Sequence, residues 1–104
     1  MPQFIYTLKP VRHDMLETGP TEAEEAVVGS HFVYLSDLKE KGVVKLAGRT
    51  TTTGPESFGI VILEVEEDGA ARAIRDNDPA VKERVLAADL QPVRIALFGD
   101  PPED

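Results

Sequence analysis

At 104 residues, the chain is long enough for one domain with one ordinary core and too short for two. Its formal net charge of −8 at pH 7 argues against nucleic acid or an anionic membrane as a partner, because both need clustered basic residues. Cysteine is absent, which excludes disulfides, thiolate catalysis and sulfur-based metal sites.

No apolar run approaches the ~18 residues of a membrane-spanning helix. The first residues, Met1 to Phe4, lack the basic stretch and apolar block of a secretory signal. Apolar residues make up 41% and charged residues 29%, which is typical of a globular protein. We therefore expect a cytoplasmic protein without a membrane or nucleic-acid partner.

The first predicted element is a strand over Gln3–Lys9, where residues alternate between two faces. Phe4, Tyr6 and Leu8 share one face, and Ile5 lies on the other. A loop over 11–20 follows, and it contains a Gly-Pro pair that is typical of turns.

A long helix is predicted from Thr21 to a stop at Gly42. Thr21 and Glu24 have the spacing of a capping box, in which each side chain binds a free backbone amide of the first turn. Apolar residues recur at helical spacing at Val27, Val28, Phe32, Leu35 and Leu38. Lysines in the last turn and a glycine after it are typical of a helix end.

The rest of the chain predicts strands at 43–50 and 58–65, short helices from Asp68 to about Asn77 and over Pro79–Leu86, and a last strand over Pro92–Phe98. A loop at 51–57 joins the second and third strands. Asp78 and Pro79 restart the helix, since aspartate favours the N-cap and proline the first helical position. Residues 1–98 are expected to form one domain, and residues 99–104 a disordered tail.

This β-α-β-β-α-β order predicts an α+β fold of the ferredoxin-like type with a four-stranded antiparallel sheet. The first and third strands are then central, and helices cover one face. The third strand is apolar on both faces, and Ile5 of the first strand adds to the apolar surface on the sheet face that the helices leave uncovered. Exposing such a face to water costs about 25 cal/mol per Å². Either loop side chains or a second subunit must cover it, and we predict a homodimer packed sheet to sheet.

His31 is the one polar side chain in the middle of an apolar helix stripe. At 100° per residue, this stripe contains Glu24, Val28, His31, Leu35 and Leu38. The stripe must face the sheet, so the imidazole is expected to point inward. Two interpretations remain open: a core histidine with both nitrogens hydrogen-bonded, or a general acid/base in a pocket, since imidazole changes charge close to neutral pH.

A histidine base needs a second group to set its tautomer, and a carboxylate is the usual partner. Asp78 is the candidate, although its place as a helix N-cap is enough to explain it. An ionised capping carboxylate with a fixed direction would also suit an imidazole. Asp76, two residues earlier, is predicted to be solvated.

Other polar residues carry weaker signals. His13 is expected on the surface, and Ser30 points about 100° away from His31, so no nucleophilic pair follows. Arg49 ends the second predicted strand as either a solvated edge residue or an anion clamp. Two histidines without a ligand spacing do not predict a metal site.

The sequence resembles the YciI-like (YCII-related) domain family over about residues 3–98. The resemblance lies in Met1-Pro2-Gln3-Phe4-Ile5-Tyr6, Gly29-Ser30-His31-Phe32-Val33-Tyr34-Leu35, Leu46-Ala47-Gly48-Arg49-Thr50, Phe58-Gly59-Ile60-Val61-Ile62 and Asn77-Asp78-Pro79-Ala80-Val81. The helix histidine, the Ala-Gly after the second strand and the Asp-Pro after the second helix are its most specific parts.

The resemblance implies a ferredoxin-like subunit assembled as a dimeric α+β barrel, with a histidine–aspartate dyad that falls here on His31 and Asp78. It also implies chemistry on small cyclic molecules, because at least one branch of the family removes chloride from a hydroxylated aromatic ring. The chain departs from the family at Lys82-Glu83-Arg84, where members often carry Ala-Gly, and at Arg49, where many have proline. An arginine at position 49 would restrict the substrates to molecules that carry a negative charge.

The function predicted on this basis is a cofactor-independent lyase or isomerase acting on a small cyclic or aromatic-derived molecule. His31 would move a proton, Asp78 would orient it, and Arg49 would bind a substrate oxyanion or carboxylate. The alternative is a non-catalytic domain of the same family that binds a small ligand or only dimerises.

Overall fold

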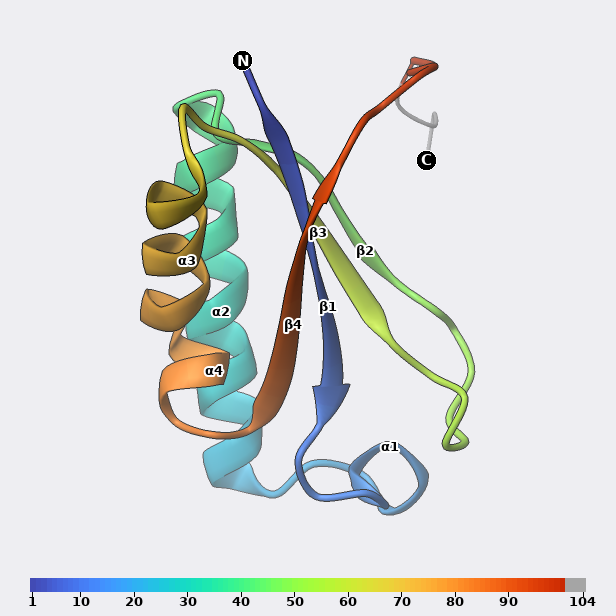
Figure 1. Cartoon of the computed structure of the whole chain (residues 1–104). Coiled ribbons are helices and arrows are strands. Elements are labelled where there is room, and N and C mark those ends of the chain that lie inside the picture. The colour runs from blue at the N-terminus through green and yellow to red at the C-terminus, as the bar shows by residue number, and fades with distance from the viewer. Residues whose placement is uncertain (101–104) are drawn as a thin grey trace.

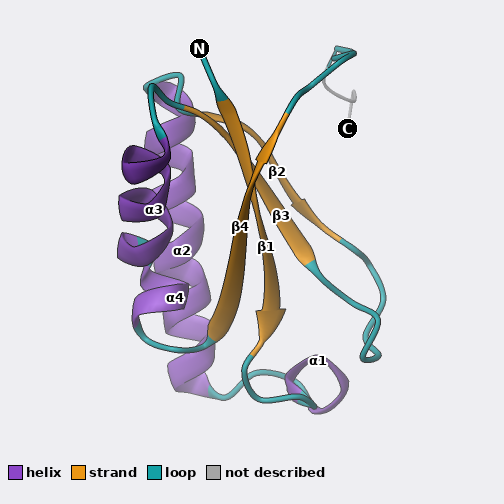
Figure 2. Cartoon of the chain, viewed as in Figure 1, coloured by secondary structure: helices purple, strands orange, loops and turns teal. Residues whose placement is uncertain are grey.

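The computed structural model describes residues 1–100, which form a four-stranded antiparallel sheet with helices packed against one face (Figures 1 and 2). The elements in chain order are β1 Gln3–Pro10, α1 Met15–Thr18, α2 Glu22–Glu40, β2 Val44–Arg49, β3 Gly59–Glu64, α3 Asp68–Asn77, α4 Pro79–Lys82 and β4 Leu86–Val93. The strand order β2-β3-β1-β4 places β1 and β3 in the centre. The predicted ferredoxin-like α+β fold is therefore confirmed.

The core lies between the sheet and the helices and follows the alternation of β1. Phe4, Tyr6 and Leu8 are all buried, and they pack with Val61 and Leu63 of β3. The expectation that these three residues of β1 share the covered face is confirmed. Helix α2 adds Leu35, the one buried residue within that helix.

Phe32, which the sequence left outside the inward stripe of α2, has 70% of its surface exposed. Phe32 follows His31 directly, so it projects about 100° from the inward line of the stripe. The helix contacts the sheet through a narrow stripe, and a residue this far off it reaches solvent. Phe32 therefore belongs to the surface beside the core.

Two boundaries near the C-terminus differ from the prediction. The last strand is Leu86–Val93, whereas the sequence predicted Pro92–Phe98, and α4 ends at Lys82. Arg84 has φ 60°, a left-handed conformation that ends the helical turn. Strand β4 then pairs with β1 along its whole length, from Pro10↔Leu86 to Gln3↔Val93. Pairing with β1 in this register therefore determines where strand β4 begins and ends.

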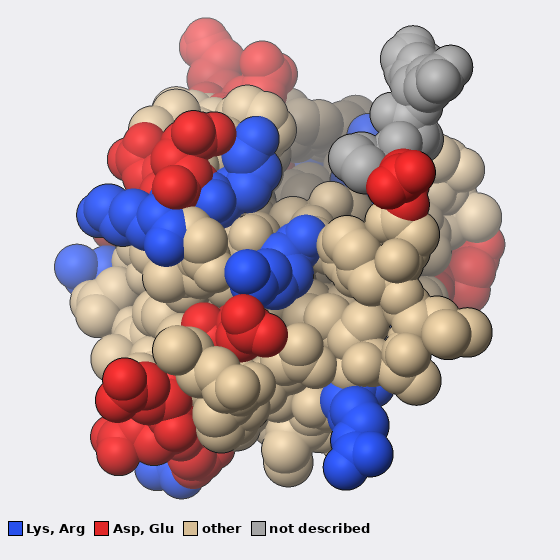
Figure 3. All heavy atoms as spheres, turned by 90° about the horizontal axis from the view of Figure 1, so that it is seen from above, with Lys and Arg blue, Asp and Glu red and all other residues tan. Residues whose placement is uncertain are grey.

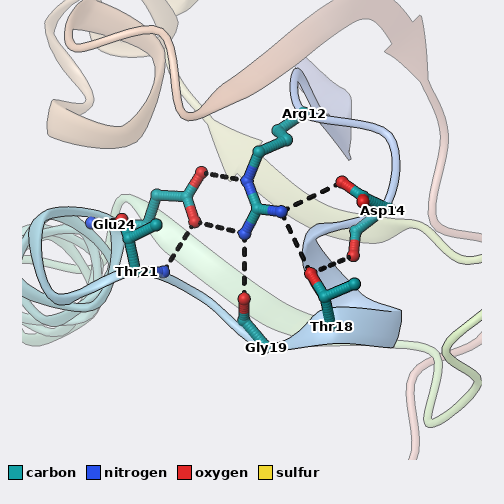
Figure 4. A network of polar contacts seen from close by, with 6 residues as sticks. All are labelled: Arg12, Asp14, Thr18, Gly19, Thr21 and Glu24. Atoms are coloured by element: carbon teal, nitrogen blue, oxygen red, sulfur yellow. Dashed lines mark hydrogen bonds and ion pairs between the residues drawn. The ribbon is translucent and has the colours of Figure 1, made fainter.

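Helix α1 forms inside the stretch predicted as a loop, and Arg12 ties it to the start of α2 (Figure 4). The Arg12 guanidinium donates to Glu24 Oε2 at 2.9 Å and to Oε1 at 2.7 Å. Its other contacts are with Asp14, Thr18 and the Gly19 carbonyl. Glu24 also accepts from the Thr21 amide, which confirms the capping box. The Arg12 hydrogen bonds lower the pKa of Glu24 to about 2, so this pair stays charged even in acid.

The sheet face turned away from the helices has an apolar patch on β1, β2 and β3, and the register places the polar residues Thr7, Gln91 and Asp89 beside it on the same face. The register places Ile5 opposite Ile62 and Leu46 opposite Ile62 on this face, and Gly48 opposite Ile60. Helices α2, α3 and α4 all lie on the other side of the sheet (Figure 2). Within residues 1–100 no helix covers this open face, as the strand pattern predicted.

The segment after β4 leaves the sheet without regular structure, and Leu97 within it is 94% exposed. Of the predicted tail, Gly99 and Asp100 are exposed, and residues 101–104 lie outside the described residues. None of the helices in residues 1–100 has the length and apolar character needed to cross a bilayer. On the face shown in Figure 3, basic side chains lie among acidic and uncharged ones and form no continuous basic stripe.

Candidate active site

The imidazole of His31 meets the carboxylate of Asp78. His31 Nδ1 lies 2.7 Å from Asp78 Oδ1 and 2.9 Å from Oδ2, across 47 residues of sequence. His31 comes from the middle of α2, and Asp78 from the junction of α3 and α4. The side chain of Asp78 is fully buried, whereas that of His31 is 14% exposed. The structure thus brings together the two residues that the sequence suggested as a pair.

Asp78 is also held from two other directions. Its Oδ1 accepts from the Ala80 amide at 3.0 Å, which is the N-cap bond of α4. Its Oδ2 accepts from the Tyr6 hydroxyl at 2.8 Å. The capping role and the contact with histidine therefore coexist, because one carboxylate has enough lone pairs for all of these donors.

Tyr6 is a member of this cluster that the sequence reasoning placed only in the core. Burial raises the pKa of Tyr6 far above its ordinary value, and the nearby Asp78 charge adds to the effect, so the phenol keeps its proton and remains a donor. One signal was present in the sequence, since a hydroxyl on the inward face of an apolar strand needs a partner.

His31 lines a cleft of about 910 Å³ between α2 and strands β2 and β3. No hydrogen bond from residues 1–100 reaches Nε2, and no buried side-chain nitrogen in this range lacks a partner. Nε2 is therefore accessible from the cleft. One nitrogen is anchored and the other is free, which is the arrangement a general acid/base requires.

Two aromatic side chains and an arginine line the same cleft. Phe32 lies on the α2 wall and Phe58 just before β3, with exposed fractions of 70% and 45%. Arg49 of β2 is paired with Gly59 of β3, and Gly59 is in turn paired with Leu8 of β1. Because Leu8 faces the helices, the side chain of Arg49 leaves the sheet on the helix side. Its guanidinium is exposed and makes one long contact, 3.4 Å, to the Thr50 carbonyl.

The charged residues that line the cleft are Glu25, Lys39, Lys45 and Arg49. Lys39 and Lys45 each lie 3.4 Å from a carboxylate, that of Glu40 and that of Glu64 respectively. Within residues 1–100 Arg49 has no such ion pair, so its guanidinium is the group of the cleft lining best placed to bind an anion.

A comparison with protein-family models identifies the family of the chain. The model of the YCII-related domain matches residues 5–94, a segment that contains Tyr6, His31 and Asp78. The chain belongs to the YCII-related domain family. No curated protein matches this YCII-related domain.

A solved structure similar to this YCII-related domain is described as 5-chloro-2-hydroxyhydroquinone dehydrochlorinase (TftG) from Burkholderia phenoliruptrix AC1100, in complex with 2,5-dihydroxybenzoquinone. The two share 21% sequence identity, and the match covers 88% of this chain and 93% of that chain with a TM-score of 0.65. At this identity the likeness shows a shared fold.

The remaining polar candidates of the YCII-related domain lie outside the cleft lining. His13 and Ser30 are exposed, and neither lines the cleft. Asp76 is exposed and pairs with the neighbouring Arg75 at 3.0 Å. Within residues 1–100, no group of three histidine, aspartate or glutamate side chains could hold a metal ion.

Proposed function

We propose that this YCII-related domain is a small-molecule enzyme of lyase or isomerase type that uses His31 as its general acid/base without a cofactor. The observation that carries the proposal is the contrast between the two ring nitrogens. Nδ1 is 2.7 Å from a buried carboxylate, whereas Nε2 is open to a cleft. A histidine that served only the core would have both nitrogens bonded within the protein.

In the proposed reaction, Nε2 removes a proton from a carbon or hydroxyl group of the substrate, and Asp78 stabilises the resulting imidazolium through Nδ1–H. The electron pair left behind forms a new double bond. In a lyase reaction, a leaving group then departs from the adjacent carbon with its own electron pair. In an isomerase reaction, the imidazolium returns the proton to a different atom.

The cleft lining supports a planar ring with an anionic oxygen or carboxylate as the substrate. Phe32 and Phe58 offer flat apolar surfaces, and the Arg49 guanidinium can bind an oxyanion with two parallel hydrogen bonds. The molecules named for the similar structure, a chlorinated hydroxyhydroquinone and a dihydroxybenzoquinone, are oxygenated rings of this kind. Arg49 is thus the proposed substrate-binding residue.

A screen of hydroxylated rings tests the proposal. The panel holds 5-chloro-2-hydroxyhydroquinone, its chlorine-free parent and ring carboxylates, with chloride release and ultraviolet absorbance as readouts. We expect turnover of at least one compound, and a loss of about tenfold or more in kcat/KM for Arg49→Gln, mainly through KM. Arg72→Gln, an exposed arginine of α3 outside the cleft lining, is the matched control. Binding without turnover would instead support the non-catalytic alternative.

We also propose that a second copy of the chain covers the open sheet face. Water against Ile5, Ile60 and Ile62 is costly, and two such faces packed together remove it. Sedimentation at micromolar concentration is expected to give twice the chain mass of 11.3 kDa. Ile62→Glu should shift the species to monomer, while Val33→Glu, on the exposed surface of α2, should not. A monomeric wild-type protein would contradict the proposal.

A further inference from the structure

The hydroxyl of Tyr6 completes a buried chain of three side chains that ends at the open nitrogen of His31. Tyr6 lies on the central strand β1 with no exposed surface. It donates to Asp78 Oδ2 at 2.8 Å, and the same carboxylate holds His31 Nδ1. Tyr6 does not line the cleft, so any influence on chemistry there passes through Asp78.

We propose that Tyr6 is a positioning residue that tunes the base strength of His31 by drawing charge from Asp78. This inference rests on the proposed role of His31 as the acid/base group. A hydrogen bond to Oδ2 stabilises the carboxylate most when the imidazole is neutral, because its negative charge is then uncompensated. The bond therefore favours the neutral imidazole, which is the form that can accept a proton.

Burial makes this influence larger than it would be at a surface. Asp78 and Tyr6 both lie inside the core, where water does not screen their interaction. The high pKa of the phenol keeps the donor in place at every pH at which the protein works. The Tyr6 hydroxyl therefore always donates a hydrogen bond to Asp78, the same carboxylate that contacts the imidazole of His31.

The second tyrosine of the chain provides a matched control. Tyr34 is partly buried on α2, and its hydroxyl donates to the Ile74 carbonyl at 2.7 Å instead of to Asp78. Tyr34→Phe also removes one tyrosine hydroxyl, but it leaves every hydrogen bond to the Asp78 carboxylate in place. The charged groups that line the cleft with His31, namely Glu25, Lys39, Lys45 and Arg49, are the same in both variants.

The test is a titration of the imidazole by two-bond ¹H–¹⁵N correlation spectra of uniformly labelled full-length protein, without any substrate. In Tyr6→Phe, the titration midpoint of the His31 ring is expected to rise by roughly 0.5–1 pH unit relative to wild type. In Tyr34→Phe it should coincide with wild type. The exposed His13 serves as an internal reference in every sample.

A second measurement covers the case in which Tyr6→Phe does not fold. Replacement of tyrosine by 3-fluorotyrosine in the Tyr34→Phe background labels only Tyr6, because the chain has two tyrosines. The fluorinated phenol is a stronger donor of the same shape, so the His31 midpoint should fall. Unchanged midpoints in both experiments would overturn the proposal and leave a structural role for Tyr6. Since no substrate is used, this outcome is independent of the turnover screen.

Discussion

Replacement of His31 by asparagine is expected to lower kcat by about 100- to 10,000-fold on any ring compound that the wild-type protein converts, because the proton acceptor is lost. The asparagine amide nitrogen can take the place of Nδ1, so the contact with Asp78 is kept while Nε2 disappears. Steady-state kinetics measures this effect.

The stability of the same variant separates a chemical loss from a structural one. Because the bond to Asp78 is conserved, the free energy of unfolding in urea should change by about 1 kcal/mol or less. His13→Asn, at the exposed histidine, should retain both activity and stability. Near wild-type turnover in His31→Asn would show that the imidazole is not the acid/base group.

Substitutions of Asp78 are expected to have the largest effect on stability. Asp78→Ala removes the acceptor for the Ala80 amide, the Tyr6 hydroxyl and His31, and we expect it to lower the free energy of unfolding by about 3–5 kcal/mol. The physical reason is that three donors stay desolvated with no acceptor. Urea denaturation followed by circular dichroism measures this loss.

Asp78→Asn divides the structural role from the chemical one. Asparagine is as good an N-cap as aspartate, so α4 should persist and the stability loss should be smaller, about 1–3 kcal/mol. A neutral amide cannot stabilise an imidazolium, and kcat should fall by about 100- to 10,000-fold. Asp76→Asn and Asp76→Ala, at an exposed position two residues away, are the controls. Full turnover by Asp78→Asn would mean that the carboxylate serves only the fold.

The covered face of β1, the capped start of α2 and the whole of α3 were predictable because their signals are local. Alternation over eight residues places Phe4, Tyr6 and Leu8 together, and Thr21 with Glu24 satisfies the free amides of a helix end. The last strand was not predictable in this way. Residues 92–98 look like a strand by composition, but hydrogen bonding along β1 selected 86–93.

For the candidate site, helical periodicity in the sequence determined that His31 points inward, and turn chemistry determined that Asp78 caps a helix. Only the tertiary structure decided that the two meet, that Tyr6 binds the far side of the carboxylate, and that Nε2 opens to a cleft. Helical periodicity gives only the direction in which a side chain points from its own helix. The distance between side chains 47 residues apart depends on how α2 and the α3–α4 junction pack on the same sheet.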